Sequence, residues 1–358
     1  MLHPLGSALR SVVALTCAGP ALLAAPFARA QQVAAPFADV PRGGETAVSL
    51  AEISVSATGV PTPVTQTGSS VTVLTSDTLQ AQQVRTAPDA LRQGPGLNVV
   101  QTGGAGGVTS VFIRGTNSNH VKVLVDGIDV NDPSTPNRAF DFSQLQTEDL
   151  SRLEVLRGPQ SGLYGADAIG GVISFVTKRG EGPPKVTAFA EGGSYGTFNQ
   201  GGRLSGASGI FDYSFSVQHL RQAALPVTPS ELLPPSVPLR TAFTDIKTVS
   251  TKLGAQLTDT FRLNYFLRFS DSAYLDQADG GFPYRPTPYR NLNDQQQLLM
   301  RGEAEWTPLP GFHNVFGANY AKFDRLFAGP LNPLAPPTPM TYLGERTRFD
   351  YRGDVQLA

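Results

Sequence analysis

The stretch "RGPQSGLYGADAIGGVISFVTKRG", from Arg157 to Gly180, separates two parts of the sequence that differ in character. Its glycines predict tight backbone bends, and the β-branched run "GVISFVTK" (Gly171–Lys178) predicts a strand. Upstream, short strand-like and helix-like segments alternate. Downstream, apolar and polar residues alternate for most of the chain to Ala358, so the sequence predicts a mixed α/β domain followed by a mainly β region.

The composition limits the function classes that the chain can belong to. Charged residues make up 16% of the 358 residues and the net charge is −1. No basic excess is available to neutralise phosphates, so nucleic acid is not expected as a partner. The 37 Gly and 29 Pro predict many turns and few long helices.

The first thirty residues have the features of a secretory signal peptide. Arg10 supplies a positive charge, Ser11–Ala25 is apolar, and Ala28–Ala30 fits a small-residue cleavage site. The only cysteine, Cys17, lies inside this segment. The sequence therefore predicts an exported protein, cleaved after residue 30, whose mature chain forms no disulfide and no cysteine-based metal site.

Residues 31–66 are rich in Ala, Pro, Gly and Thr and show no sustained period, which predicts a linker. Within it, "AEISVSATG" (Ala51–Gly59) alternates like an edge strand. Two interpretations are open from the residues alone. The segment is either a strand of the following domain or a peptide that adds itself to the sheet of another protein.

Residues 67–180 are expected to form the mixed domain. Val71–Leu74 predicts a strand, Ser76 or Asp77 a helix cap, and Pro88 the first turn of a second helix. Two strand-like runs and one helix-like run follow, namely "TSVFIRG" (Thr109–Gly115), "HVKVLVDGIDV" (His120–Val130) and "SQLQTEDLSRLEVL" (Ser143–Leu156).

No catalytic arrangement is evident in the sequence, so an enzyme is not expected. Ser161 lies in "GPQSG", which lacks the glycine spacing of a nucleophile elbow. The glycine run Gln101–Gly107 is not followed by a helix that could bind phosphate. The four histidines have no metal-ligand spacing and are His3, His120, His219 and His313.

Three blocks of the mixed domain resemble the plug-domain signature of TonB-dependent outer-membrane receptors. They are "FIRGTNSNHVKVLVDGIDVND" (Phe112–Asp132), "LEVLRGP" (Leu153–Pro159) and "SGLYGADAIGGVISFVTKRG" (Ser161–Gly180). The run Gly103–Gly127 is most similar to the cobalamin (vitamin B12) receptor branch. The resemblance implies active import across the outer membrane of a Gram-negative bacterium. TonB and its inner-membrane energising complex are the implied protein partners, and lipid surrounds the barrel.

The resemblance also implies roles for particular residues. "EISVSAT" looks like a TonB box, comprising Glu52, Ile53, Ser54, Val55, Ser56, Ala57 and Thr58. Arg114 and Arg157 fall where the family places plug arginines that pair with glutamates of the barrel, and Glu154 and Glu191 are the candidate partners. Expected ligand contacts lie in two plug turns, at Gly103, Gly104, Val108, Ser110, Asn131, Asp132, Asn137 and Arg138.

The alternation in residues 181–358 predicts strands with one apolar face. In "TFRLNYFLRFSD" one face carries Phe261, Leu263, Tyr265, Leu267 and Phe269, and the other carries Arg262, Asn264, Arg268 and Ser270. The same pattern places Phe211, Tyr213, Phe215 and Val217 on one face, and likewise Thr347, Phe349, Tyr351, Val355 and Leu357. The expected strands are 185–193, 197–206, 210–219, 243–257, 260–270, 295–307, 311–323 and 346–357.

The connections between these strands favour a membrane barrel over a soluble sandwich. Gaps after the second, fourth and sixth strands are short, whereas those after the third, fifth and seventh are about twenty residues long, as in outer-membrane barrels with short periplasmic turns. Eight strands would close to a diameter of only about 16 Å, whereas a plug of this size spans roughly 30 Å. We therefore expect a plug inside an antiparallel barrel of 22 strands, of which about eight are present here, in a longer protein.

The resemblance implies cobalamin as the ligand, with one departure from that branch. The cobalamin branch has an aspartate-rich, calcium-binding loop after the third strand, but Leu220–Arg240 contains one acid, Glu231. A weak calcium candidate is the later set Asp271, Asp276 and Asp279. We expect no covalently bound cofactor, and cobalamin binding without strong calcium dependence. A receptor for an iron–siderophore or haem is the alternative, and a secreted β-rich adhesion protein is the second.

Overall fold

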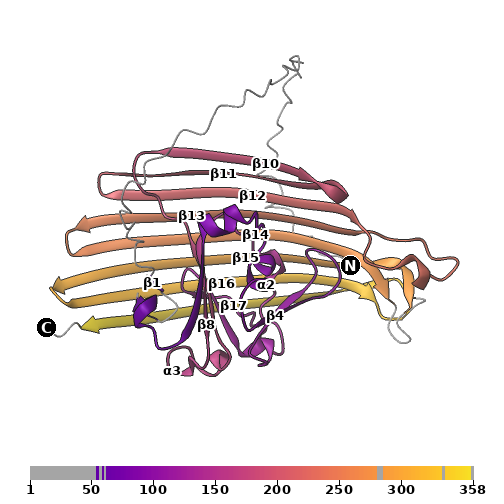
Figure 1. Cartoon of the computed structure of the whole chain (residues 1–358), viewed down its shortest axis with the longest axis horizontal. Coiled ribbons are helices and arrows are strands. Elements are labelled where there is room, and N and C mark those ends of the chain that lie inside the picture. Colours follow the sequence, from indigo (N-terminus) through magenta and orange to yellow (C-terminus); the bar gives the residue numbers. More distant parts are fainter. Residues whose placement is uncertain (1–53, 56–58, 60–61, 280–284, 333–334, 356–358) are drawn as a thin grey trace, which may run out of the picture. The chain divides into compact units, whose positions relative to one another are not determined.

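The computed structural model describes residues 54–55, 59, 62–279, 285–332 and 335–355. These residues form a mixed domain and an antiparallel sheet of eight long strands, labelled in Figure 1. The fold class is therefore the one that the sequence predicts. None of the helices in the described ranges is long and apolar enough to cross a bilayer.

The mixed domain is built on a five-stranded sheet in the order β3, β8, β9, β6, β7. β6 and β9 pair in parallel and the other neighbours pair antiparallel. The strands are β3 (Ser70–Thr75), β6 (Val121–Val125), β7 (Ile128–Asp129), β8 (Leu150–Arg157) and β9 (Gly171–Thr177). Two separate hairpin pairs are β1 (Ser54–Val55) with β2 (Thr62–Pro63) and β4 (Leu97–Gln101) with β5 (Thr109–Ile113).

The helices of this domain are short. α1 (Ser76–Ala81) begins one residue earlier than expected, because Thr75 is the cap and its side chain accepts a hydrogen bond from the Thr78 amide. α2 (Ala87–Arg92) has Pro88 in its first turn, as expected. The other helical turns of this domain are α3 (Ser161–Tyr164) and the 3₁₀ turns η1 (Val64–Gln66), η2 (Ser118–His120), η3 (Phe142–Gln144) and η4 (Ala166–Ala168). Two further 3₁₀ turns, η5 (Ser194–Gly196) and η6 (Ser230–Leu232), lie in connections between the long strands.

The helix expected over Ser143–Leu156 is wrong. Only the turn η3 is helical there, and the rest of the segment is mainly strand β8. β8 lies between β3 and β9, and its residues Leu153–Arg157 are all buried. A strand that is buried on both faces has no alternating pattern, so its sequence cannot be distinguished from that of a buried helix by periodicity.

The apolar core of the mixed domain gathers side chains from its central strands, including Val123, Leu153, Ile173 and Phe175. The core continues into the long-strand sheet through four side chains, Phe266, Leu299, Ala321 and Phe323. Each large side chain buried in this way contributes about 1.5–3 kcal/mol. One contiguous core therefore joins the mixed domain to a small patch of the long-strand sheet.

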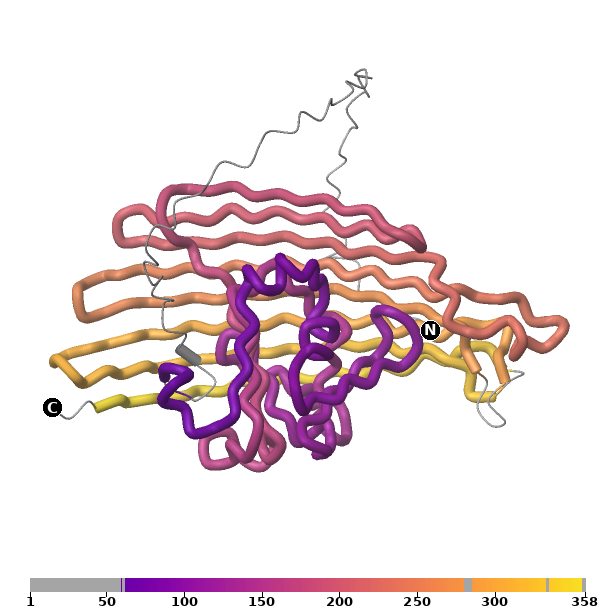
Figure 2. Tube along the Cα trace, in the orientation of Figure 1, coloured from indigo at the N-terminus to yellow at the C-terminus, as the bar shows by residue number. Residues whose placement is uncertain are grey.

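The eight long strands, which we call the wall, follow one another in chain order, and every neighbouring pair is antiparallel. In Figure 2 the chain colour changes steadily from strand to strand across the wall. The strands are β10 (Lys185–Gly193), β11 (Thr197–Ser208), β12 (Phe211–Leu225), β13 (Ala242–Thr258), β14 (Phe261–Asp279), β15 (Pro286–Leu309), β16 (Phe312–Pro330) and β17 (Pro337–Val355).

The wall strands are longer than expected at one end. The short turns at residues 209–210, 259–260 and 310–311 are confirmed. Much of the second and third expected long loops is strand, whereas the first keeps a connection over residues 226–241. β14, for example, continues to Asp279. In the extension of β14 the outward side chains are mixed, with polar Asp271 followed by apolar Ala273 and Leu275. The apolar alternation is therefore interrupted although the hydrogen-bond ladder continues, and the loops were overestimated.

Candidate functional site

The two faces of the wall differ in polarity. Arg268 faces the mixed domain, where its Nε lies 3.9 Å from an oxygen of the buried Asp149. Because side chains alternate along a strand, Arg262, Asn264 and Ser270 share this inward face. The outward face carries Phe261, Leu263, Tyr265, Leu267 and Phe269. Leu357 lies outside the described residues, but the described members of the other two predicted sets also face outward. The faces expected from the sequence are confirmed.

The apolar outward band ends at a continuous row of polar residues. Each residue of this row is paired with the next one on the adjacent strand. From β11 to β16 the row consists of Gln200, His219, Lys247, Asp271, Gln296 and Asp324. Below the row, the part of β14 from Phe269 to Phe261 is roughly 27 Å long. With the strand tilted by about 40° from the membrane normal, it spans roughly 21 Å of the membrane thickness. This height is close to the apolar band of about 25 Å on outer-membrane barrels.

A glycine-rich loop of the mixed domain, residues 102–108, lies directly against the wall. The Gly104 amide donates a hydrogen bond of 2.9 Å to the Tyr274 hydroxyl, and the Thr244 hydroxyl donates to the Ala105 carbonyl. Gly103 has φ +75°, and a Cβ there would overlap the Tyr274 hydroxyl. The close approach to the wall that the sequence predicts for these glycines is confirmed.

A second loop, residues 129–138, is fixed to the wall by arginines. Arg346 of β17 pairs with Asp129 at 2.6 Å and donates to the Asn131 carbonyl. Arg325 of β16 lies 3.2 Å from an oxygen of Asp132. Lys122 also pairs with Asp129, at 2.5 Å. Both loops are therefore held in place from the wall.

Residues 63–172 match the family model described as "TonB-dependent Receptor Plug Domain". The chain contains a TonB-dependent receptor plug domain. The matched residues include four of the five strands of the mixed sheet, the start of β9 and both loops that contact the wall, so the mixed domain is a plug. Together with the apolar outward face of the wall, this makes the chain an outer-membrane protein of a Gram-negative bacterium.

Solved receptors share the fold of the plug and wall. The siderophore receptor PirA from Acinetobacter baumannii is 21% identical, with a TM-score of 0.62 over 80% of this chain and 45% of PirA. A ferric enterobactin receptor (PfeA) from Pseudomonas aeruginosa is 15% identical, with a TM-score of 0.60 over 81% and 47%. The ferripyoverdine receptor of Pseudomonas aeruginosa is 13% identical, with a TM-score of 0.53 over 84% and 45%. This chain spans about half the length of these receptors.

The structure corrects the partners expected for the charged plug residues. Arg157 donates to the Ser70 hydroxyl at 2.8 Å and to the Pro95 carbonyl at 2.7 Å, both within the plug. Burial and the nearby Arg114 lower the pKa of Arg157. Glu154 is fully buried in β8 and binds Arg152 at 2.6 Å, so it is not a wall residue.

The expected wall glutamate Glu191 does bind a plug arginine, but its partner is Arg85. Neither Arg114 nor Arg157 pairs with a wall carboxylate among the described residues. Arg85 comes from the segment just before α2 and Glu191 from β10. Because the pairing joins distant segments, no local signal in the sequence could have selected Arg85.

The expected ligand-contact residues differ in exposure. Asn131 and Asp132 are 1% and 3% exposed. The Asn131 side chain bonds the Val123 amide and the Val121 carbonyl, and Asp132 accepts from Ser134, so both hold the loop together. Gly104 is also buried, and Ser110 is half-buried in β5. The exposed members of the set are Gly103, Val108, Asn137 and Arg138.

The weak metal candidates do not converge. Asp271 and Asp276 lie an odd number of residues apart on β14, so their side chains project from opposite faces of the strand. Asp271 accepts a hydrogen bond from Gln296, whereas Asp276 accepts from Asn291. Within the described ranges, no group of three His, Cys, Asp or Glu side chains is placed to hold an ion.

The TonB-box assignment falls mostly outside the described residues. Glu52, Ile53, Ser56, Ala57 and Thr58 lie outside them. Ser54 and Val55 form β1, which pairs antiparallel with Thr62 and Pro63. Farther along, the Gly59 carbonyl accepts a hydrogen bond of 2.5 Å from Arg352 of β17. The segment that follows the expected box therefore contacts the wall.

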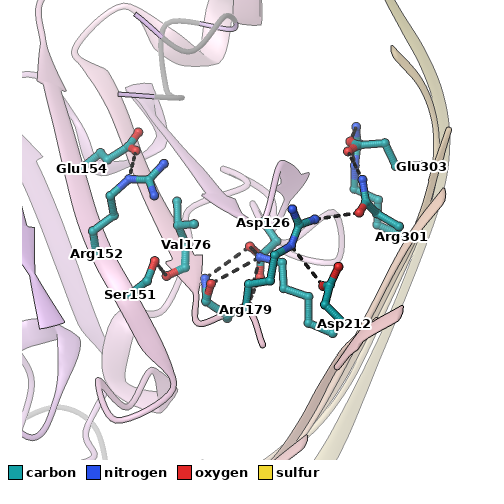
Figure 3. A network of polar contacts seen from close by, with 12 residues as sticks. Asp126, Ser151, Arg152, Glu154, Val176, Arg179, Asp212, Arg301 and Glu303 are labelled. Carbon is teal, nitrogen blue, oxygen red and sulfur yellow. Dashed lines mark hydrogen bonds and ion pairs between the residues drawn. The ribbon is translucent and has the colours of Figure 1, made fainter. Parts of the chain in front are cut away.

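The end of the plug is joined to the wall by a network of charges. Figure 3 draws part of it, including Asp126, Arg179 and Asp212. Lys252 donates to Asp126 at 2.6 Å. Arg179 donates to Asn264 at 2.6 Å and lies 3.4 Å from Asp212. Beside them, Arg301 binds Glu303 at 2.7 Å and Asp350 at 2.8 Å, while Arg262 pairs with Asp212. The sequence analysis missed this network, although its wall members occupy polar positions of the predicted inward face.

The network borders a polar cavity of about 420 Å³ between the plug and the wall. Arg152, Arg179, Lys252 and Arg301 line it with cations, and Asp126, Glu181 and Glu303 supply carboxylates. The lysine and arginine groups in the network are paired with acids or amides. Arg152 is likewise paired, with Glu154, so each cation that lines the cavity has a partner.

Farther along the inward face, several buried polar atoms have no hydrogen-bond partner among the described residues. On the wall these are atoms of Arg203, Gln218, Thr248, Arg268 and Ser270, and on the plug they are Gln146 Oε1 and Asp149 Oδ2. The wall members occupy two adjacent rows of paired residues. Burial raises the pKa of the Asp149 carboxyl. The contact between plug and wall is therefore polar and incompletely paired in this strip.

Proposed function

We propose that the chain acts in TonB-dependent active import of a scarce ligand across the outer membrane. The supporting observation is a plug domain that lies against an apolar-faced wall and is attached to it largely through polar contacts. Such contacts can be exchanged for contacts with water at small cost, because a hydrogen bond contributes only about 0.5–1.5 kcal/mol net. Displacing the plug would open a path along the wall.

In this proposal the chain is organised as a signal peptide (1–30), a periplasmic linker with the TonB box (31–66), the plug (67–180) and the first part of the barrel (181–358). TonB binds Glu52–Thr58 as an added strand, because main-chain hydrogen bonds give affinity to extended peptides. The extended pairing of Ser54 and Val55 with Thr62 and Pro63 is compatible with this role. The inner-membrane energising complex supplies the force that displaces the plug.

For the ligand we propose a metal chelate, with a ferric siderophore as the first candidate. The solved receptors of the same fold are named for siderophores. Cobalamin is the second candidate, favoured by the resemblance of Gly103–Gly127 to the cobalamin branch. We propose contact through the exposed groups Gly103, Val108, Asn137 and Arg138, which lie in loops held by the rigid wall.

The test is uptake by cells that lack the native gene and express the full-length protein. Labelled cobalamin and a panel of ferric siderophores and haem are supplied separately, each with and without a calcium chelator. Val55→Pro removes a backbone donor from the TonB box, and Val48→Pro is the matched control outside it. We expect one ligand to accumulate, with Val55→Pro abolishing uptake while surface binding persists. Uptake unchanged by Val55→Pro, or no ligand bound at all, would contradict the proposal.

A further inference from the structure

The outward face of the wall contains a hollow of about 730 Å³. Its floor is formed by small residues on two neighbouring strands, Gly302 and Ala304 of β15 and Ala318 of β16. Gly302 is paired with Ala318, so two small residues lie side by side. A Cβ added at Gly302 would meet no atom within 4 Å, which confirms that this position opens into free space.

Larger apolar side chains form the two sides of the hollow. Leu263 and Tyr265 of β14 are the direct partners of Ala304 and Gly302 on one side. Phe316 and Phe349, on β16 and β17, border it on the other. In Figure 1 these strands are consecutive in the wall. The lining also includes Phe211 and Tyr213 of β12 and Leu253 and Ala255 of β13. The hollow is therefore a trough that crosses the strands of the wall, and small residues form its floor at β15 and β16.

All the lining residues whose side chains lie on the outward face of the wall are apolar or aromatic. Asp212, Asn264 and Glu303 also border it, but they belong to the inward face. There, Asp212 pairs with Arg262, Asn264 accepts from Arg179, and Glu303 binds Arg301. The trough consequently offers dispersion contacts and no free charge, which suits an uncharged hydrocarbon chain.

The depth of the trough in the membrane follows from the polar row. Gly302 is six residues from Gln296, a member of that row, which corresponds to roughly 16 Å at about 3.4 Å per residue and 40° tilt. The trough thus lies in the half of the apolar band nearer the short, periplasmic turns. Trp306, four residues farther and 45% exposed, lies roughly 26 Å below the row, where interfacial tryptophans are expected.

We propose that this trough holds one acyl chain of a phospholipid from the periplasmic leaflet of the outer membrane. The outward face is in contact with lipid along the whole band, and at Gly302, Ala304 and Ala318 small residues let a chain lie between larger side chains and contact protein on three sides. Such a chain is retained longer than the lipid around the rest of the wall. The inference depends on the position of the wall in the outer membrane and not on the imported ligand.

The test uses the full-length receptor in bilayer nanodiscs that contain a phosphatidylethanolamine with a photoreactive diazirine in one acyl chain. After irradiation, labelled peptides are mapped by mass spectrometry. Labelling is expected to concentrate on the strands that carry Gly302 and Ala318. Gly302→Leu fills the trough, so labelling there should fall at least five-fold. Gly192→Leu is the control for a leucine added far from the trough. Gly192 faces outward on β10, two residues beyond the polar row, and a Cβ there would also meet no atom within 4 Å.

Ala318→Leu provides a second way to fill the trough if Gly302→Leu does not fold, and resistance of the folded barrel to SDS before heating verifies folding. Ligand uptake should be unchanged in these variants, so this test is independent of the import assay. Labelling spread evenly over outward positions, or equal labelling with Gly302→Leu and Gly192→Leu, would show ordinary surrounding lipid only. Receptor dimers in native mass spectra that disappear with Gly302→Leu would identify a second copy as the occupant and overturn the proposal.

Discussion

The interior of the plug and its contact with the wall are held together by different forces. Leu153, Ile173 and Phe175 are fully buried in an apolar core, to which the wall contributes only a small patch. Around that patch the contact consists of ion pairs, hydrogen bonds and partly unpaired polar groups. Exposing apolar surface costs about 25 cal/mol per Å², whereas polar contacts can be replaced by water. The difference suits a domain that stays folded while it moves relative to the wall.

The strongest test of this comparison is a cavity in the plug interior. Phe175→Ala should destabilise the plug by about 3–5 kcal/mol, because it removes a fully buried ring from a packed core. Limited proteolysis of the plug across a denaturant series measures the loss. Phe198→Ala is the control, since Phe198 is 43% exposed on the outward face and should change plug stability by less than about 0.5 kcal/mol. Equal effects of the two changes would remove the distinction between core and surface.

The next largest effect is expected from an unpaired charge at the interface. Lys252→Met leaves Asp126 buried beside the wall without its cation and should cost about 3 kcal/mol. The double variant Lys252→Met with Asp126→Asn should recover part of this loss, which a double-mutant cycle in the same proteolysis assay measures. If the plug of Lys252→Met were as stable as that of the native protein, the ion pair between Lys252 and Asp126 would not stabilise the contact between plug and wall.

A smaller loss of stability is expected from replacing glycines of the plug, and two of them separate the cost of backbone strain from the cost of a lost contact with the wall. Gly103 and Gly115 have almost the same φ, +75° and +79°, but only Gly103 lies against a wall side chain. Gly115→Ala should cost about 1 kcal/mol from strain alone. Gly103→Ala should cost about 2 kcal/mol, because the Tyr274 hydroxyl must also move. If both cost the same in thermal unfolding, the contact between loop 102–108 and the wall contributes nothing.

The smallest effect is a dependence on pH. Burial raises the pKa of Asp149 above its ordinary 3.8, so the folded protein takes up this proton at a higher pH than the unfolded chain. Stability from this group is fully present below the unfolded pKa and is lost as pH rises through the folded pKa. Asp149→Asn should therefore flatten the slope of stability against pH above about 4. An unchanged slope would mean that another group, and not Asp149, titrates there.

The sequence predicted well those features that depend on short-range pattern. The faces of β14, the short turns and the Pro88 helix follow from periodicity and turn chemistry, and the structure confirms them. It failed at β8, where burial on both faces erases the period, and at the long hairpins, where strands continue beyond the apolar band. In those regions the strands are stabilised by hydrogen bonds to neighbouring strands. The pattern of residues along a single strand does not show which strand lies beside it.

The candidate site was predicted less well than the fold. The turns predicted to contact the ligand, residues 103–110 and 131–140, overlap the loops 102–108 and 129–138 that contact the wall. Within them, the side chains of Asn131 and Asp132 hold the second loop together. The arginines that hold the second loop, Arg325 and Arg346, come from strands about two hundred residues away in sequence. Whether a polar side chain faces a ligand or braces a loop depends on such distant partners, which a single sequence does not specify.

The polar row from Gln200 to Asp324 also provides a reference level from which the depth of other outward residues in the membrane can be counted. Its members are paired from strand to strand, so every outward residue has a known number of steps to the row. At about 3.4 Å per step and 40° tilt, each residue corresponds to roughly 2.6 Å of depth. A reporter group attached at any outward position can therefore be assigned a depth in the bilayer by counting. Two such reporters on different strands would measure how far the wall tilts when the membrane changes thickness.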